Sequence, residues 1–143
     1  FYDYCVRQKK RLKFRKNGVQ RKPLLRKWEK LNEYFNDLYT FKDLSLSEYL
    51  KQKNTKYAIE RLLFLIAETI LDFLEHILAS KFDVISESYE DIIKNAMKYE
   101  IITENLYKDL KGLGSFRNIL AHEYLELNDE QVYQNMKKND KNF

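Results

Sequence analysis

The residues best suited to chemistry lie in one short stretch, GSFRNILAHEYLELND, at positions 114–129. Arg117, Asn118, His122 and Tyr124 fall within eight residues of one another, and His122 is one of two histidines in the chain. If the stretch is helical, Asn118 and His122 share a face because they are four residues apart. Arg117 and Tyr124, seven residues apart, also nearly superpose. The sequence therefore predicts a polar cluster around His122.

An imidazole beside a guanidinium suits phosphodiester cleavage. His122 can take a proton from a ribose 2′-hydroxyl or give one to the leaving oxygen. Arg117 can stabilise negative charge in the transition state, and Asn118 can orient the histidine or bind a phosphate oxygen. This scheme needs no metal and no other cofactor. The spacing alone is not specific, however, and it also fits a helix that forms a surface or a dimer contact.

Other chemistries find less support in the sequence. We recognise no acid pair suited to a glycosidase, no Ser-His-Asp arrangement and no P-loop, and one histidine with one nearby glutamate does not make a metal site. The single cysteine, Cys5, excludes an internal disulfide and a cysteine-rich zinc site, so we expect a reduced, cytoplasmic setting. The longest apolar run, residues 62–67, is far short of a membrane span, and we recognise no signal peptide.

The length and composition predict one all-α domain. A chain of 143 residues can bury a real core, and three glycines with one proline favour long helices over a β fold. Periodic apolar residues and capping patterns predict an antiparallel up-and-down helical bundle. The predicted helices are residues 24–39, a short helix at 46–51 after Ser45, 57–78 capped by Asn54 or Thr55, 89–97 after Ser88, one from Thr103 that leads into the polar stretch, and 129–138 after Asn128.

Three features of these helices carry further expectations. Residues 57–78 are apolar over much of the helix circumference, so this helix should lie centrally or make a subunit contact. His76 falls in its last turns, where the helix dipole favours a cation, and we interpret it as structural. Gly112 and Gly114 each cost a helix about 1 kcal/mol relative to alanine, which is natural where a backbone or a ligand approaches closely.

The basic charge is concentrated at one end of the sequence. Residues 1–30 contain twelve Lys or Arg and two acids, whereas the other 113 residues contain fourteen bases and twenty acids. We assign residues 1–23 to a basic arm and residues 24–143 to the folded domain. The arm could neutralise RNA phosphates, or it could be a solvated extension or foreign sequence. Its candidate RNA-binding residues are Arg7, Lys9, Lys10, Arg11, Lys13 and Arg15.

The segment from Arg117 through His122 to Tyr124 resembles the motif of HepT-type toxins in the HEPN superfamily, which is Arg, four residues, His, any residue, Tyr. The resemblance extends over about residues 24–138. It includes a long helix containing Glu60-Arg-Leu-Leu63 and ending in Glu75-His-Ile-Leu78, the Ser88-Tyr89 helix, and the segment 127–133. Residues 1–23 have no recognised counterpart, and the chain stops sooner after Tyr133 than such proteins tend to.

The resemblance implies an all-α, two-fold dimer that acts as a metal-independent endoribonuclease on tRNA or mRNA. The cleft would combine the motifs of both subunits, with Arg117, Asn118 and His122 catalytic. It further implies a partner, a minimal nucleotidyltransferase antitoxin of the MntA type, which would inactivate the toxin by adding AMP to Tyr124. The alternative is a non-catalytic helical module that serves as the regulatory or binding subunit of such a nucleotidyltransferase.

Overall fold

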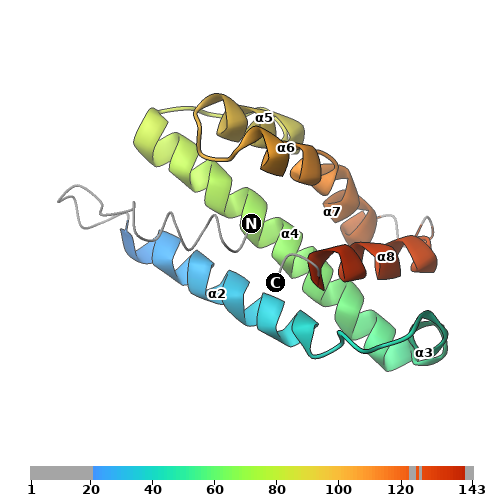
Figure 1. The fold of residues 1–143 in the computed structure, drawn as a ribbon. Helices are drawn as coiled ribbons and strands as arrows, with labels where there is room; N and C mark the ends of the chain where they lie inside the picture. Colours follow the sequence, from blue (N-terminus) through green and yellow to red (C-terminus); the bar gives the residue numbers. More distant parts are fainter. Residues whose placement is uncertain (1–20, 123–124, 126, 141–143) are drawn as a thin grey trace.

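Every regular element of the structure, a computed structural model that describes residues 21–122, 125 and 127–140, is helical. The all-α class is therefore confirmed for these residues, and no strand occurs among them. The α-helices, drawn in Figure 1, are α2 Arg21–Tyr39, α3 Leu46–Lys51, α4 Lys53–Phe82, α5 Tyr89–Lys98, α6 Glu104–Leu110, α7 Leu113–His122 and α8 Asp129–Asp140.

Helix α4 is the central element. Its 30 residues give it a length of about 45 Å, and it contacts α2, α3, α5, α7 and α8. In Figure 1 it runs diagonally through the molecule, with α2 along one side and α5 to α7 along the other. Ten of its side chains are buried between Ile59 and Leu78, as its broad apolar circumference requires. The predicted central position is confirmed.

Helix α2 shows how the sequence pattern becomes packing. Its buried side chains recur at steps of three and four residues, so they form one stripe that faces α4. The stripe consists of Leu24, Trp28, Leu31, Phe35 and Leu38. The helix begins at Arg21, two residues earlier than the predicted arm ends. Pro23 is tolerated there because the first turn of a helix does not use its own N–H groups.

The predicted N-caps are largely confirmed. Ser45 and Glu48 form a complete capping box before α3, and the hydroxyls of Ser88 and Thr103 accept backbone N–H bonds at the starts of α5 and α6. Asn128 does the same for α8, through its bond from the Gln131 N–H at 3.1 Å. Each such bond satisfies a helix N–H group that has no partner within the helix.

Two predicted boundaries were wrong. Helix α4 follows Gln52 without any side-chain cap, so neither Asn54 nor Thr55 caps it, because packing along its length outweighs the end effect. The helix that begins after Thr103 also does not continue into the polar stretch. It ends at Leu110, and a turn at Lys111 and Gly112 separates it from α7.

The structure does not support a cationic His76 near the end of α4, while its interpretation as structural stays a prediction. The side chain is half-buried, and it lies six residues before the end of α4, beyond the last turn where the helix dipole acts. Burial, followed by the nearby charge of Lys27, lowers the pKa of His76. The protein therefore favours the neutral imidazole.

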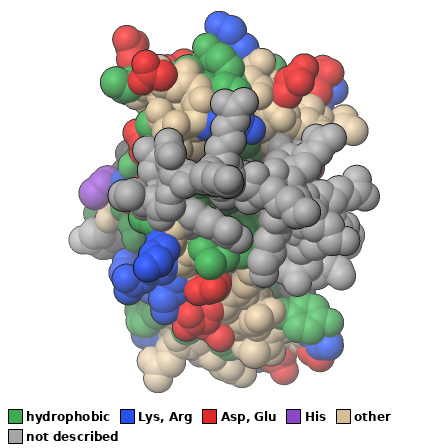
Figure 2. Space-filling view, turned by 90° about the vertical axis from the view of Figure 1, so that its left-hand side faces the viewer, with side chains coloured by type: hydrophobic (Ala, Val, Ile, Leu, Met, Phe, Trp, Pro, Cys, Tyr) green, Lys and Arg blue, Asp and Glu red, His purple; other side chains and the backbone are tan. Residues whose placement is uncertain are grey.

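Charge on the described surface is mixed. Figure 2 shows one face of the molecule, on which basic and acidic side chains are interspersed. The six candidate RNA-binding residues of the arm, from Arg7 to Arg15, lie outside the described residues. No helix in the described ranges is both long enough and apolar enough to cross a membrane.

Two tyrosines pack on each other, and replacing each with phenylalanine should change the free energy of unfolding in opposite directions. The rings of Tyr49 and Tyr133 lie 5.7 Å apart. The Tyr133 hydroxyl donates to the Leu44 carbonyl at 2.8 Å, whereas the Tyr49 hydroxyl is buried without a partner among the described residues. Burial accordingly raises the pKa of Tyr49.

We expect Tyr49→Phe to raise the free energy of unfolding by about 1 kcal/mol, because it removes a buried hydroxyl that makes no hydrogen bond. Tyr133→Phe should lower the free energy of unfolding by about 1 kcal/mol, because it breaks a hydrogen bond. Urea unfolding of the two variants beside the wild type measures both changes. A loss of stability in Tyr49→Phe would contradict the assignment of that hydroxyl as unpaired.

Candidate active site

Helix α7 carries the polar residues and packs against both α4 and α5. Gly114, in its first turn, is buried. A Cβ at this position would lie 2.6 Å from the Cβ of Tyr89 on α5, so only glycine lets the two helices come this close. The expected close approach is confirmed for Gly114. It was wrong for Gly112, where an added Cβ would meet nothing within 4 Å.

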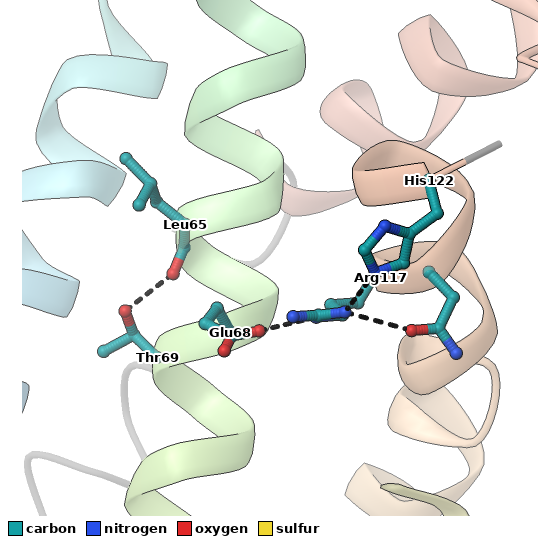
Figure 3. Close-up of polar contacts among 6 residues, drawn as sticks. Leu65, Glu68, Thr69, Arg117 and His122 are labelled. Carbon is teal, nitrogen blue, oxygen red and sulfur yellow. Dashed lines mark hydrogen bonds and ion pairs between the residues drawn. The ribbon is translucent and has the colours of Figure 1, made fainter. Parts of the chain in front are cut away.

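The Arg117 side chain lies at the centre of the polar contacts. Its Nε donates to Glu68 Oε2 on α4 at 2.6 Å, and its Nη1 donates to Asn118 Oδ1 at 3.2 Å. Figure 3 shows Glu68 and Arg117 reaching toward each other between the two helices. The hydrogen bond to Glu68 is the main cause that raises the pKa of Arg117. The guanidinium is therefore a fixed positive charge at any physiological pH.

Two aromatic rings hold the same guanidinium. Its central carbon lies 5.3 Å from the ring centroid of Phe64 on α4 and 5.3 Å from that of Tyr89 on α5. Both distances are within the range of a cation–π attraction. Three helices thus contribute to the surroundings of one side chain, which leaves the side chain only 16% exposed.

His122 is exposed in the last turn of α7. Its Nε2 lies 3.5 Å from Nη1 of Arg117, as Figure 3 shows. An arginine N–H can donate to this nitrogen only when the nitrogen carries no proton. An imidazole with an unprotonated Nε2 is also the form that a general base requires.

The structure brings Arg117, Asn118 and His122 together, but the arginine is the member that joins them. Asn118 accepts a bond from Arg117, and no hydrogen bond connects Asn118 with His122 directly. The suggestion that Asn118 orients the histidine is therefore replaced by an indirect link through the guanidinium. Tyr124 lies outside the described residues.

Sequence reasoning missed Glu68, Phe64 and Tyr89, which surround the arginine. Glu68 is the one acid within the apolar run of residues 62–71, and it follows Phe64 by four residues on the same helical face. A charged side chain in such a run requires a partner, and this was the available signal. The partner itself lies 49 residues away, so the sequence could not identify it.

A groove with a volume of about 430 Å³ lies beside Asn118. Its walls come from α4, from the segment before α5, from α5 itself and from α7, and they include Glu75, Ser86, Tyr89, Glu90 and Ser115. Three hydrogen bonds to α5 order the segment 86–88, from Asn95 Nδ2 to Ser86 Oγ, from Glu87 N to Asp91 Oδ2, and from Asp91 N to Ser88 Oγ. The groove directly adjoins the polar cluster through Asn118. Within the described ranges, no three His, Cys, Asp or Glu side chains are grouped to hold a metal ion.

The close approach at Gly114 predicts a matched pair of glycine variants. Gly114→Ala should lower the free energy of unfolding by about 1–3 kcal/mol, since the new methyl group meets Tyr89 at its rigid Cβ. Gly112→Ala should be neutral or slightly stabilising, because the site is open and its φ is negative. Thermal unfolding distinguishes the two variants. Equal stability of both would contradict the described packing of α5 on α7.

Comparison with known proteins places these residues in a wider context. The family described as Ribonuclease HepT-like matches residues 24–142. The chain is also similar to a tRNA nuclease HepT from Aphanizomenon flos-aquae (strain 2012/KM1/D3). The two are 31% identical over 105 residues, which cover 73% of this chain and 71% of that relative.

Proposed function

This chain belongs to the HepT-like ribonuclease family, and we propose that it is a metal-independent endoribonuclease toxin of a HEPN–MNT toxin–antitoxin pair. Arg117, Asn118 and His122 form its catalytic group. The observation that carries the proposal is the contact of 3.5 Å between Arg117 Nη1 and His122 Nε2, which places a fixed positive charge beside a proton acceptor. The relative described as a tRNA nuclease supports tRNA as the first substrate to test.

The proposed reaction follows from these two groups. His122 Nε2 removes the proton of a ribose 2′-hydroxyl, and the 2′-oxygen attacks the adjacent phosphorus. The bond from phosphorus to the 5′-oxygen breaks, and a protonated imidazole supplies the proton of the leaving group. The products are a 2′,3′-cyclic phosphate and a 5′-hydroxyl. Arg117 stabilises the charge that builds on the phosphoryl oxygens, and Asn118 fixes the guanidinium that does so.

A two-fold dimer is part of the proposal, because one histidine cannot be base and acid at the same time. The exposure of α7 supports it. Phe116 and Leu120 pack against the core of this chain, whereas Ile119 and Ala121 are half-buried without belonging to it, and Gly114 is the one buried residue of this helix. A second copy that packs on this face would cover Ile119 and Ala121 and bring two sets of Arg117 and His122 to one axis.

The proposed control acts on Tyr124, two residues after His122. A minimal nucleotidyltransferase of the MntA type transfers AMP from ATP to the tyrosine hydroxyl and releases pyrophosphate. The added phosphate brings negative charge and bulk close to Arg117, where it competes with the RNA phosphate. In this scheme cleavage stops while the fold is unchanged. The basic arm, residues 1–23, offers a second contact for the RNA backbone.

The cleavage proposal predicts that the purified protein cuts tRNA in EDTA. We expect His122→Ala and Arg117→Ala each to lower the rate by about 100-fold or more, since each removes a general base or a transition-state contact. His76→Ala is the matched control, because it removes the other histidine and should leave cleavage unchanged. Gel analysis of end-labelled tRNA gives the rates.

Equal cleavage by all variants, no cleavage by the wild type, or a need for added Mg²⁺ would each contradict this mechanism. Retained RNA or nucleotidyltransferase binding without cleavage would instead favour the non-catalytic module. The molar mass in solution, measured by light scattering, tests the dimer separately.

The modification proposal predicts a mass increase of one or more AMP groups after incubation with the nucleotidyltransferase and ATP. Tyr124→Phe should not gain this mass, because it lacks the acceptor hydroxyl. Tyr133→Phe is the control, since it removes a hydroxyl from a different helix. Equal labelling of Tyr124→Phe and the wild type, or no labelling of the wild type, would refute the assignment.

A further inference from the structure

We propose that Glu68 is a positioning residue for the reaction, which holds the Arg117 guanidinium beside His122, where it meets the scissile phosphate. This inference rests on the proposed function. It concerns a residue of the central helix, far in sequence from the polar stretch, that is expected to act on RNA only through Arg117.

The contact between the two side chains is short and sheltered. Glu68 Oε2 lies 2.6 Å from Arg117 Nε, with 32% of the Glu68 side chain and 16% of the Arg117 side chain exposed. Charge-assisted bonds of this length are among the stronger hydrogen bonds in proteins. The bond also joins two helices that pack on each other, α4 and α7. The packing therefore limits the movement of Glu68 and Arg117 relative to one another. The carboxylate is therefore a fixed anchor for the arginine.

The remaining contacts determine which nitrogen is available. Nε is used by Glu68, and Nη1 faces both Asn118 Oδ1 and His122 Nε2. Nη2 has no hydrogen bond to another described residue. The rings of Phe64 and Tyr89, each 5.3 Å from the guanidinium carbon, restrict the tilt of its plane. A phosphate that approaches His122 thus meets a guanidinium whose Nη1 side and plane are held in one orientation.

The Glu68 carboxylate helps to orient Arg117 but weakens the binding of RNA. Its negative charge offsets the positive charge of Arg117, so it weakens the general attraction for RNA. Its benefit lies in orientation, which acts on the transition state more than on the bound substrate. Glu68 should therefore raise kcat without lowering KM. A residue that merely stabilised the fold would not separate these two quantities.

Asp72 provides a matched control. It lies one turn after Glu68 on α4 and pairs with Lys27 at 3.8 Å. It acts on Arg117 through its charge alone, as the last and weakest of the causes that raise the pKa of the arginine. Asp72→Asn therefore removes the same charge from the same helix without breaking a contact of the guanidinium.

The test compares Glu68→Ala, Glu68→Gln and Asp72→Asn with the wild type in steady-state cleavage of tRNA. We expect kcat of Glu68→Ala to fall by about 100-fold, the effect typical of a misplaced catalytic group, while KM stays the same or falls. Glu68→Gln keeps an acceptor oxygen and should recover most of kcat, and Asp72→Asn should match the wild type. An unchanged kcat in Glu68→Ala would overturn the proposal, as would a rise in KM without a change in kcat.

A second measurement does not depend on activity. In ¹⁵N-labelled protein, the Nε–H of Arg117, identified by its loss in Arg117→Lys, should exchange slowly with water in the wild type and rapidly in Glu68→Ala. Equal exchange in the two proteins would overturn the positioning role even if the enzyme is active. If the wild type cleaves no RNA but the exchange difference is present, the proposed function fails and the anchoring by Glu68 stands.

Discussion

The ion pair between Glu68 and Arg117 is the interaction on which the candidate site depends. It connects the central helix α4 to the helix that carries the polar motif. Because both groups are only partly exposed, loss of either partner would leave the other charge uncompensated in a partly sheltered place. The packing of α7 on α4 brings the two groups together, and the pair gives the guanidinium its direction.

The docking in turn depends on packing that involves no charge at all. The ten buried side chains of α4 hold α2 on one flank and α5 and α7 on another. Gly114 then lets α7 approach α5 until the ring of Tyr89 reaches Arg117. A larger residue at this position would separate the helices and withdraw the ring. The apolar core and the absence of a side chain at Gly114 thus determine the geometry of the polar site.

Helix α7 packs against α4 and α5 on one side and is exposed to solvent on the other. His122 is exposed, and the apolar residues around the motif are only half-buried. This combination is what a shared cleft requires, because the reacting groups must reach a substrate while the apolar groups meet a second copy. The groove beside Asn118 lies between α7 and the start of α5, next to the polar cluster.

The helical class, the capped helix starts and the clustering of Arg117 with His122 could all be predicted from the order of residues. These features depend on local periodicity and on residues close in the chain, where spacing translates directly into geometry. The order of residues alone did not determine the break at Lys111 and Gly112, the uncapped start of α4 or the partners of the arginine. Those depend on contacts between residues distant in sequence, such as Glu68 and Arg117, which are 49 positions apart. Only the packing of α4, α5 and α7 decided that an acid in an apolar run would become the anchor of the motif arginine.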